Sequence, residues 1–107
     1  MVLTKEQQNF VDVLRSGEYK QCKNALTNFS EENKNTKYCC LGVACKLDGK
    51  SQEFIFNHRI GIESVVPEYL KYVAYELVAL NDEGKSFAEI ADIYEFYVQT
   101  GMWANKL

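Results

Sequence analysis

Apolar residues recur at helical spacing near the start of the chain and predict a first helix from Lys5 to about Arg15. Thr4 and Gln7 form a capping box at its beginning, because a threonine hydroxyl and an amide three residues later satisfy each other's free backbone N–H groups. Gly17 is expected to end this helix, since glycine readily adopts a positive φ.

The second half of the chain shows the same helical period twice. Pro67–Leu80 carries a broad apolar face, with a break predicted near Ala74. Ser86 and Glu89 form a second capping box, which starts a last helix that ends at Gly101. Three tyrosines are expected to widen the apolar face of the earlier helix: Tyr69, Tyr72 and Tyr75.

The middle of the chain has weaker periodicity. Tyr38–Leu47 ("YCCLGVACKL") is apolar and rich in small residues, which predicts a short helix at the centre of the fold, where neighbouring elements approach closely. Glu18–Ala25 fits either a short helix or a packed loop. Asn28–Lys37 is polar and rich in Asn, so we expect a solvated, mobile loop. The β-prone stretches Gln52–Phe56 and Ile60–Ser64 predict a small, weakly formed hairpin.

The predicted fold class is therefore mainly α with a small β-hairpin, an α+β fold. Residues 1–107 are expected to form one compact globular domain of four to five helices around the cysteine-rich helix. Aromatic residues make up 13% of the chain, and a homodimer would be an economical way to cover surplus aromatic surface.

The net charge and the expected cellular compartment make some classes of function less probable. The net charge is −3, which lowers the expectation of nucleic-acid binding without forbidding it. No stretch reaches the roughly 18 apolar residues of a membrane span, and the first residues do not resemble a signal peptide. We therefore expect a cytoplasmic protein without membrane partners, in which the four Cys are reduced thiols.

The segment Leu80–Phe96 describes two helices joined by a tight turn. A DNA-reading pair would expose basic or amide side chains early in its second helix, but the outward residues here are Glu89 and Asp92. A structural corner is the favoured interpretation. A nucleic-acid-associated regulator that uses this helix-turn-helix-like pair is the alternative, and it would need a basic patch of Lys71, Lys85 and Lys106.

The four cysteines suggest a third hypothesis, that the chain is a thiol- or zinc-dependent enzyme. Cys39, Cys40 and Cys45 do not have the spacing of a zinc site, and Cys22 and His58 would join them only through the fold. A cysteine nucleophile would need a base, and His58 is the only histidine, so a Cys45–His58 pair oriented by Glu or Asp is the catalytic arrangement to consider. Core cysteines are favoured, and no phosphate-binding glycine loop occurs. We predict no metal ligands, no catalytic residues and no cofactor.

Three stretches together resemble a widespread family of uncharacterised short phage and prophage proteins. They are "LRSGEYKQCKNAL" (Leu14–Leu26), "YCCLGVACKL" (Tyr38–Leu47) and "LNDEGKSFAEIADI" (Leu80–Ile93). Such proteins combine Arg-Ser-Gly-Glu-Tyr, Cys-Cys-Leu-Gly-Val and Leu-Asn-Asp-x-Gly-x-Ser-Phe-x-x-Ile-Ala in this order. The resemblance implies a phage-encoded intracellular protein and supplies no catalytic residues.

The favoured function is a small, non-enzymatic phage accessory protein that acts by binding in the host cell. Its target would be a host protein, such as a defence or regulatory factor, or a small signalling molecule. Five polar residues within the three motifs are candidates for a ligand or partner pocket beside the cysteine helix: Arg15, Tyr19, Gln21, Asn81 and Asp82.

Overall fold

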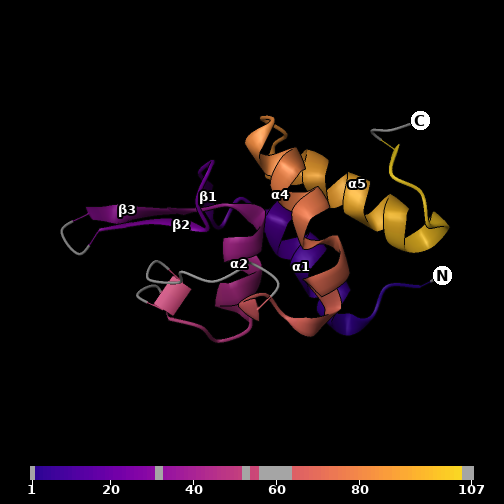
Figure 1. The fold of residues 1–107 in the computed structure, drawn as a ribbon, viewed down its shortest axis with the longest axis horizontal. Coiled ribbons are helices and arrows are strands. Elements are labelled where there is room, and N and C mark those ends of the chain that lie inside the picture. The colour runs from indigo at the N-terminus through magenta and orange to yellow at the C-terminus, as the bar shows by residue number, and fades with distance from the viewer. Residues whose placement is uncertain (1, 31–32, 52–53, 56–63, 105–107) are drawn as a thin grey trace.

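Helices surround a short central helix, and a small sheet extends from one side of them (Figure 1). The computed structural model describes residues 2–30, 33–51, 54–55 and 64–104. The elements in chain order are α1 (Lys5–Ser16), β1 (Lys20–Gln21), β2 (Thr27–Ser30), β3 (Asn33–Tyr38), α2 (Cys40–Leu47), the 3₁₀ helix η2 (Glu68–Val73), α4 (Ala74–Asp82) and α5 (Phe87–Thr100). The predicted α+β class, with helices around the cysteine-rich segment, is confirmed.

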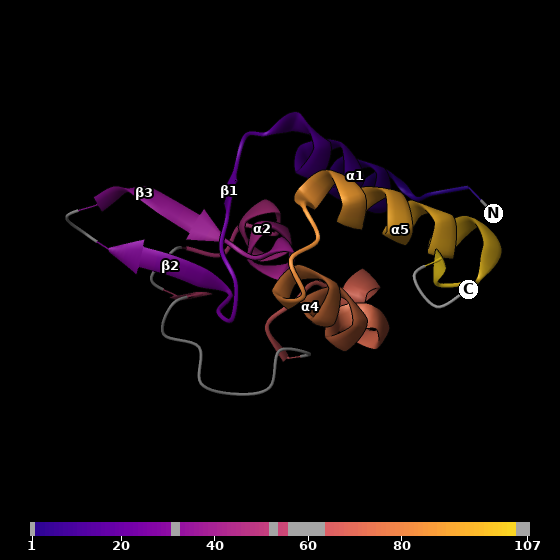
Figure 2. The same cartoon turned by 90° about the horizontal axis from the view of Figure 1, so that it is seen from above.

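Local capping fixes α1 and α5 where the sequence predicts them. Both capping boxes form, at Thr4 and at Ser86. Gly17 and Gly101 end the two helices with φ of 76° and 78°, in the left-handed region that glycine tolerates. The two helices lie side by side on one face of the domain (Figure 2).

The sheet lies where a mobile loop was expected, so the loop prediction for Asn28–Lys37 is wrong. β3 is the middle strand; it pairs antiparallel with β2 and parallel with β1. These strands lack the apolar alternation that predicts a strand, and their pairing uses backbone hydrogen bonds, which do not depend on the side chains. One of their anchors is the buried Thr27, whose hydroxyl donates to the carbonyl of Lys37 at 2.8 Å. The ambiguous stretch Glu18–Ala25 contains β1 followed by a loop in which residues 23–25 are exposed.

The hairpin predicted over Gln52–Phe56 and Ile60–Ser64 falls largely outside the described residues. Phe54 and Ile55 are described, and their backbone is helical, not extended. The amide of Ile55 donates to the carbonyl of Ser51 at 3.1 Å, as in a helical turn.

The predicted break near Ala74 is confirmed, because η2 ends at Val73 and α4 begins at Ala74. The widening of the apolar face by three tyrosines is wrong for two of them. Tyr72 and Tyr75 are 96% and 63% exposed. The change of helix type interrupts the common face, and the inner side of α4 is filled by aliphatic residues and Asn81.

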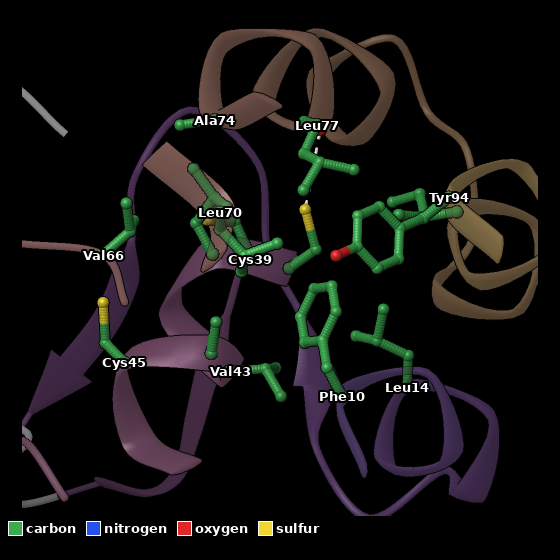
Figure 3. Packing of buried hydrophobic residues seen from close by; sticks show 14 of the residues in the cluster. Phe10, Leu14, Cys39, Val43, Cys45, Val66, Leu70, Ala74, Leu77 and Tyr94 are labelled. Carbon is green, nitrogen blue, oxygen red and sulfur yellow. Dashed lines mark hydrogen bonds between the residues drawn. The ribbon is translucent and has the colours of Figure 1, made fainter. Parts of the chain in front are cut away.

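The core is built around α2, as the small residues of that segment predict. All residues from Cys40 to Cys45 are buried. A Cβ atom on Gly42 would collide with the carbonyl oxygen of Leu26, so the loop before β2 packs directly on the helix backbone. On the other side of α2, the rings of Phe10 and Tyr94 meet edge to face, with centroids 5.5 Å apart (Figure 3).

Candidate functional site

Three of the five predicted site residues come together around the buried side chain of Asn81. Its Oδ1 accepts hydrogen bonds from the Gln21 Nε2 at 2.9 Å and from the Cys40 backbone amide at 3.1 Å. Its Nδ2 donates to the carbonyl of Cys22 at 2.8 Å. The residue before α2 makes no side-chain cap, so Asn81 supplies that cap from α4. The amide of Gln21 also donates to the carbonyl of Lys85 at 2.7 Å.

Asp82 extends this cluster toward the surface. Its Oδ1 accepts from the backbone amide of Asn24 at 2.9 Å, which holds Asn24 at a φ of 64°. Asp82 also lines a small hollow of about 160 Å³ together with Cys39 and Val78. With these contacts the carboxylate anchors the loop after β1, and the hollow beside it is too small for more than a very small ligand.

Arg15 and Tyr19 lie apart from the Asn81 cluster. Arg15 Nη2 contacts Asp92 at 2.7 Å and Glu95 at 3.2 Å, so it links α1 to α5. The hydrogen bonds to these carboxylates raise the pKa of the Arg15 guanidinium. Tyr19 packs edge to face on Tyr38, with ring centroids 5.4 Å apart. The five residues therefore do not line one cavity, and their role in binding stays a prediction.

The thiols are poorly suited to nucleophilic chemistry. Cys39, Cys40 and Cys45 are buried, and burial raises the pKa of Cys39 to about 11 and that of Cys45 to about 12. The pKa of Cys40 lies well above its ordinary value for the same reason. Cys22 is half-buried, and burial also raises its pKa. Thiols with such pKa values stay protonated at neutral pH and are weak nucleophiles.

Histidine and metal chemistry gain no support from the described residues. The predicted partner of Cys45, His58, lies outside them. Within residues 2–30, 33–51, 54–55 and 64–104, no group of three or more His, Cys, Asp or Glu side chains converges on a possible metal position.

A further hollow in the described structure is a groove that the sequence analysis did not predict. It measures about 520 Å³ and lies between the start of α1, η2 and the end of α5. We call it the tyrosine groove. Its lining residues are Gln7, Tyr69, Tyr72, Val73, Tyr94, Tyr97, Val98, Gln99, Thr100 and Gly101. The sequence does hold a sign of this groove, because tyrosines recur at helical spacing in η2 and in α5. That pattern was interpreted as part of the hydrophobic core.

The tyrosines of the groove differ in their exposure. Tyr72 is almost fully exposed, whereas Tyr94 is 1% exposed. The hydroxyl of Tyr94 points into the core, where it has no hydrogen-bond partner within the described structure (Figure 3). Burial raises the pKa of Tyr94 to about 12, and the nearby Gln7 amide opposes this rise. The ring of Tyr97 stacks on Trp103, with centroids 4.2 Å apart, so Trp103 docks at this end of the molecule.

The corner between α4 and α5 has the acidic exterior that the sequence predicts. Glu89 and Asp92 are exposed along the first part of α5, where they would repel phosphates. Of the lysines required for a basic patch, Lys71 is paired with Glu68 at 2.7 Å, and Lys106 lies outside the described residues. These positions give the nucleic-acid alternative no support.

In the portion of the chain that the structure describes, no helix combines the length and the apolarity needed to span a membrane.

Comparison with known proteins identifies the family of this chain. No curated protein and no solved structure matches it at a significant level. Residues 3–69 match a family described as a domain of unknown function, DUF8296. The match covers more than half of the chain and runs from the residue before the first capping box into η2. The chain therefore belongs to the DUF8296 family of domains of unknown function.

Proposed function

We propose that this chain is a small phage-encoded accessory protein that acts by binding a host protein and catalyses no reaction. The observation that carries the proposal is the tyrosine groove, which is lined by four of the seven tyrosines of the chain. Tyrosine offers a large apolar ring with a polar end and loses little conformational freedom on binding. It is therefore enriched in protein interfaces and in their energetically dominant contacts.

The composition of the groove favours a protein over a small signalling molecule as the target. Many intracellular signalling molecules carry phosphate groups, which proteins usually bind with Arg, Lys or helix N-termini. None of the ten residues that line the groove is charged, so the groove offers no cationic side chain to a phosphate group. A polypeptide surface needs no such charges.

The phage assignment is supported by the three sequence stretches that resemble short phage and prophage proteins. In such a protein, a binding surface directed at a host defence or regulatory factor would provide function without catalytic residues. The high pKa values of the thiols agree with a non-enzymatic role.

Affinity purification from host cells with two matched variants tests this proposal. Tyr72→Ala removes a groove residue that is 96% exposed, so the fold should be unaffected. Tyr75→Ala removes an exposed tyrosine outside the groove. We expect a stoichiometric host protein to co-purify with the wild type and with Tyr75→Ala. Tyr72→Ala should retain clearly less of it, because truncating an interface tyrosine that contributes strongly to binding weakens the complex by about 2 kcal/mol or more.

Far-UV circular dichroism would verify that both variants fold. A host protein that binds equally to wild type and Tyr72→Ala would argue against the groove as the interface. Substrate turnover by the purified chain, with no retained protein, would refute the binding function itself.

A further inference from the structure

Cys22 and Cys39 directly follow the two residues that end the parallel pairing of β1 with β3. Gln21 lies opposite Tyr38 in that ladder, and the amide of Cys22 donates to the carbonyl of Tyr38 at 2.9 Å. Cys39 keeps the extended backbone of a strand, with a φ of −79° and a ψ of 174°. The two cysteines therefore lie opposite each other, one step beyond the last pair of the ladder.

The side chain of Asn81 fixes the separation of the two backbones at this step. In an unbroken parallel ladder, the next hydrogen bond would join the carbonyl of Cys22 to the amide of Cys40. Here the Asn81 amide group lies between them: it donates to the Cys22 carbonyl at 2.8 Å and accepts from the Cys40 amide at 3.1 Å. The backbones thus separate slightly beyond the spacing of paired strands, which is about 4.8 Å. Disulfides span about 4.4–6.8 Å between Cα atoms, so this position suits one.

Both thiols face the same short loop. The Cys22 thiol donates to the carbonyl of Ala25 at 3.6 Å. Cys39 lines the small hollow beside Asp82 together with Ala25 and Leu26, and its amide donates to the carbonyl of Leu26 at 3.0 Å. Beyond the effect of burial, the Asp82 carboxylate raises the pKa of both thiols, as expected where all three side chains lie near one another.

The other two cysteines point toward different elements. The Cys40 thiol donates to the carbonyl of Leu77 in α4 at 3.5 Å, and the Cys45 thiol donates to the carbonyl of Val65 at 3.7 Å. Both are buried, whereas Cys22 is half-buried. An oxidant from solvent therefore reaches Cys22 first.

We infer that Cys22 and Cys39 are a redox pair that hydrogen peroxide joins in a disulfide. The Cys22 sulfur attacks the peroxide, breaks its O–O bond and becomes a sulfenic acid, while the other oxygen leaves as water. The Cys39 sulfur then attacks the sulfur of the sulfenic acid, whose hydroxyl group leaves as a second water with the Cys39 proton. The thiol pair loses two electrons in total, and the peroxide gains them.

The product is a lasting change of state, because both steps are slow. Burial raises the pKa of Cys22 and raises that of Cys39 to about 11, so little thiolate is present at neutral pH. The disulfide closes a loop that contains β2 and β3, and it restricts the unfolded chain. Oxidation therefore makes the protein more stable, and this device is independent of the proposed binding of a host protein.

Peptide mapping of the full chain after peroxide treatment at low protein concentration tests the inference. Without reductant, trypsin should release residues 21–23 linked to residues 38–46, and fragmentation in the mass spectrometer should place the bond at Cys39 rather than Cys40 or Cys45. The intact chain should lose the mass of two hydrogen atoms. Its urea midpoint should rise by roughly 1–2 M and return to the starting value with dithiothreitol.

Two variants control the test. Cys22→Ser, at a half-buried position, should keep the fold and lose both the linked peptide and the peroxide-dependent rise in the urea midpoint. Cys45→Ala should keep the linked peptide, because its thiol faces Val65. The inference is overturned if both thiols stay free after treatment, if Cys22 links two chains, or if Cys22 is oxidised to a sulfinic acid while Cys39 remains a thiol.

Discussion

Replacing Asn81 with alanine should destabilise the fold more than any exposed polar substitution, because this side chain joins three segments that are distant in sequence. Its amide caps the backbone N–H of Cys40 at the start of α2 and holds the carbonyl of Cys22 after β1. The Asn81 side chain also accepts a hydrogen bond from the side chain of Gln21. Gln21 donates a second hydrogen bond to the carbonyl of Lys85, which it would keep when Asn81 is replaced.

The expected magnitude follows from the groups that lose their partner. In Asn81→Ala the Cys40 amide and the Cys22 carbonyl both lose a hydrogen bond, and each unsatisfied buried group costs about 1–3 kcal/mol. The free energy of unfolding should therefore fall by about 2–6 kcal/mol, a large part of the roughly 5–15 kcal/mol of a small domain. Asn81→Leu should lose a similar amount, because it restores volume without the hydrogen bonds.

Urea denaturation followed by far-UV circular dichroism measures the effect. For a slope of about 1–1.5 kcal/mol/M, the midpoint of Asn81→Ala should fall by at least roughly 1.3 M. Asn9→Ala, at an exposed position on α1, is the matched control and should change stability by less than about 0.5 kcal/mol. A loss below about 1 kcal/mol in Asn81→Ala, or full stability in Asn81→Leu, would show that the hydrogen bonds do not hold these segments together.

Three further predictions concern the core and the thiols. Gly42→Ala should destabilise the protein by about 2–4 kcal/mol in urea denaturation, because its Cβ would meet the Leu26 carbonyl oxygen; near-wild-type stability would contradict this packing. Tyr94→Phe should raise the free energy of unfolding by about 1 kcal/mol, since it removes a buried hydroxyl without a partner; a loss would reveal a partner for that group. Burial raises the pKa of the Cys39 thiol to about 11, so the folded state keeps a proton that the unfolded thiol releases near pH 9. Stability should therefore be full below about pH 9 and fall as the pH rises toward 11, by about 2 kcal/mol from Cys39 alone and by more in total because burial also raises the pKa of Cys40 and Cys45. A urea midpoint independent of pH over this range would refute the burial effect.

A part of the candidate site could be predicted from the sequence only where short motifs of the chain contain its residues. The motif residues Gln21, Asn81 and Asp82, predicted as pocket residues, lie close together in the structure, and their internal hydrogen bonds suit a structural role. The tyrosine groove was not predicted. A hollow between α1, η2 and α5 depends on how three elements pack, and apolar periodicity does not distinguish a buried tyrosine from one on a rim.

The sequence by itself determined the features whose physical cause lies within a few residues. The capping boxes at Thr4 and Ser86 and the terminal glycines bound α1 and α5 correctly, because the groups that satisfy each other are three or four residues apart. Only the tertiary structure decided the state of Asn28–Lys37. Its polar residues indicate a loop, yet its backbone groups find partners in β1 and across the hairpin. Strand pairing between separate segments is set by the packing of the whole domain, and no local pattern in this stretch encodes it.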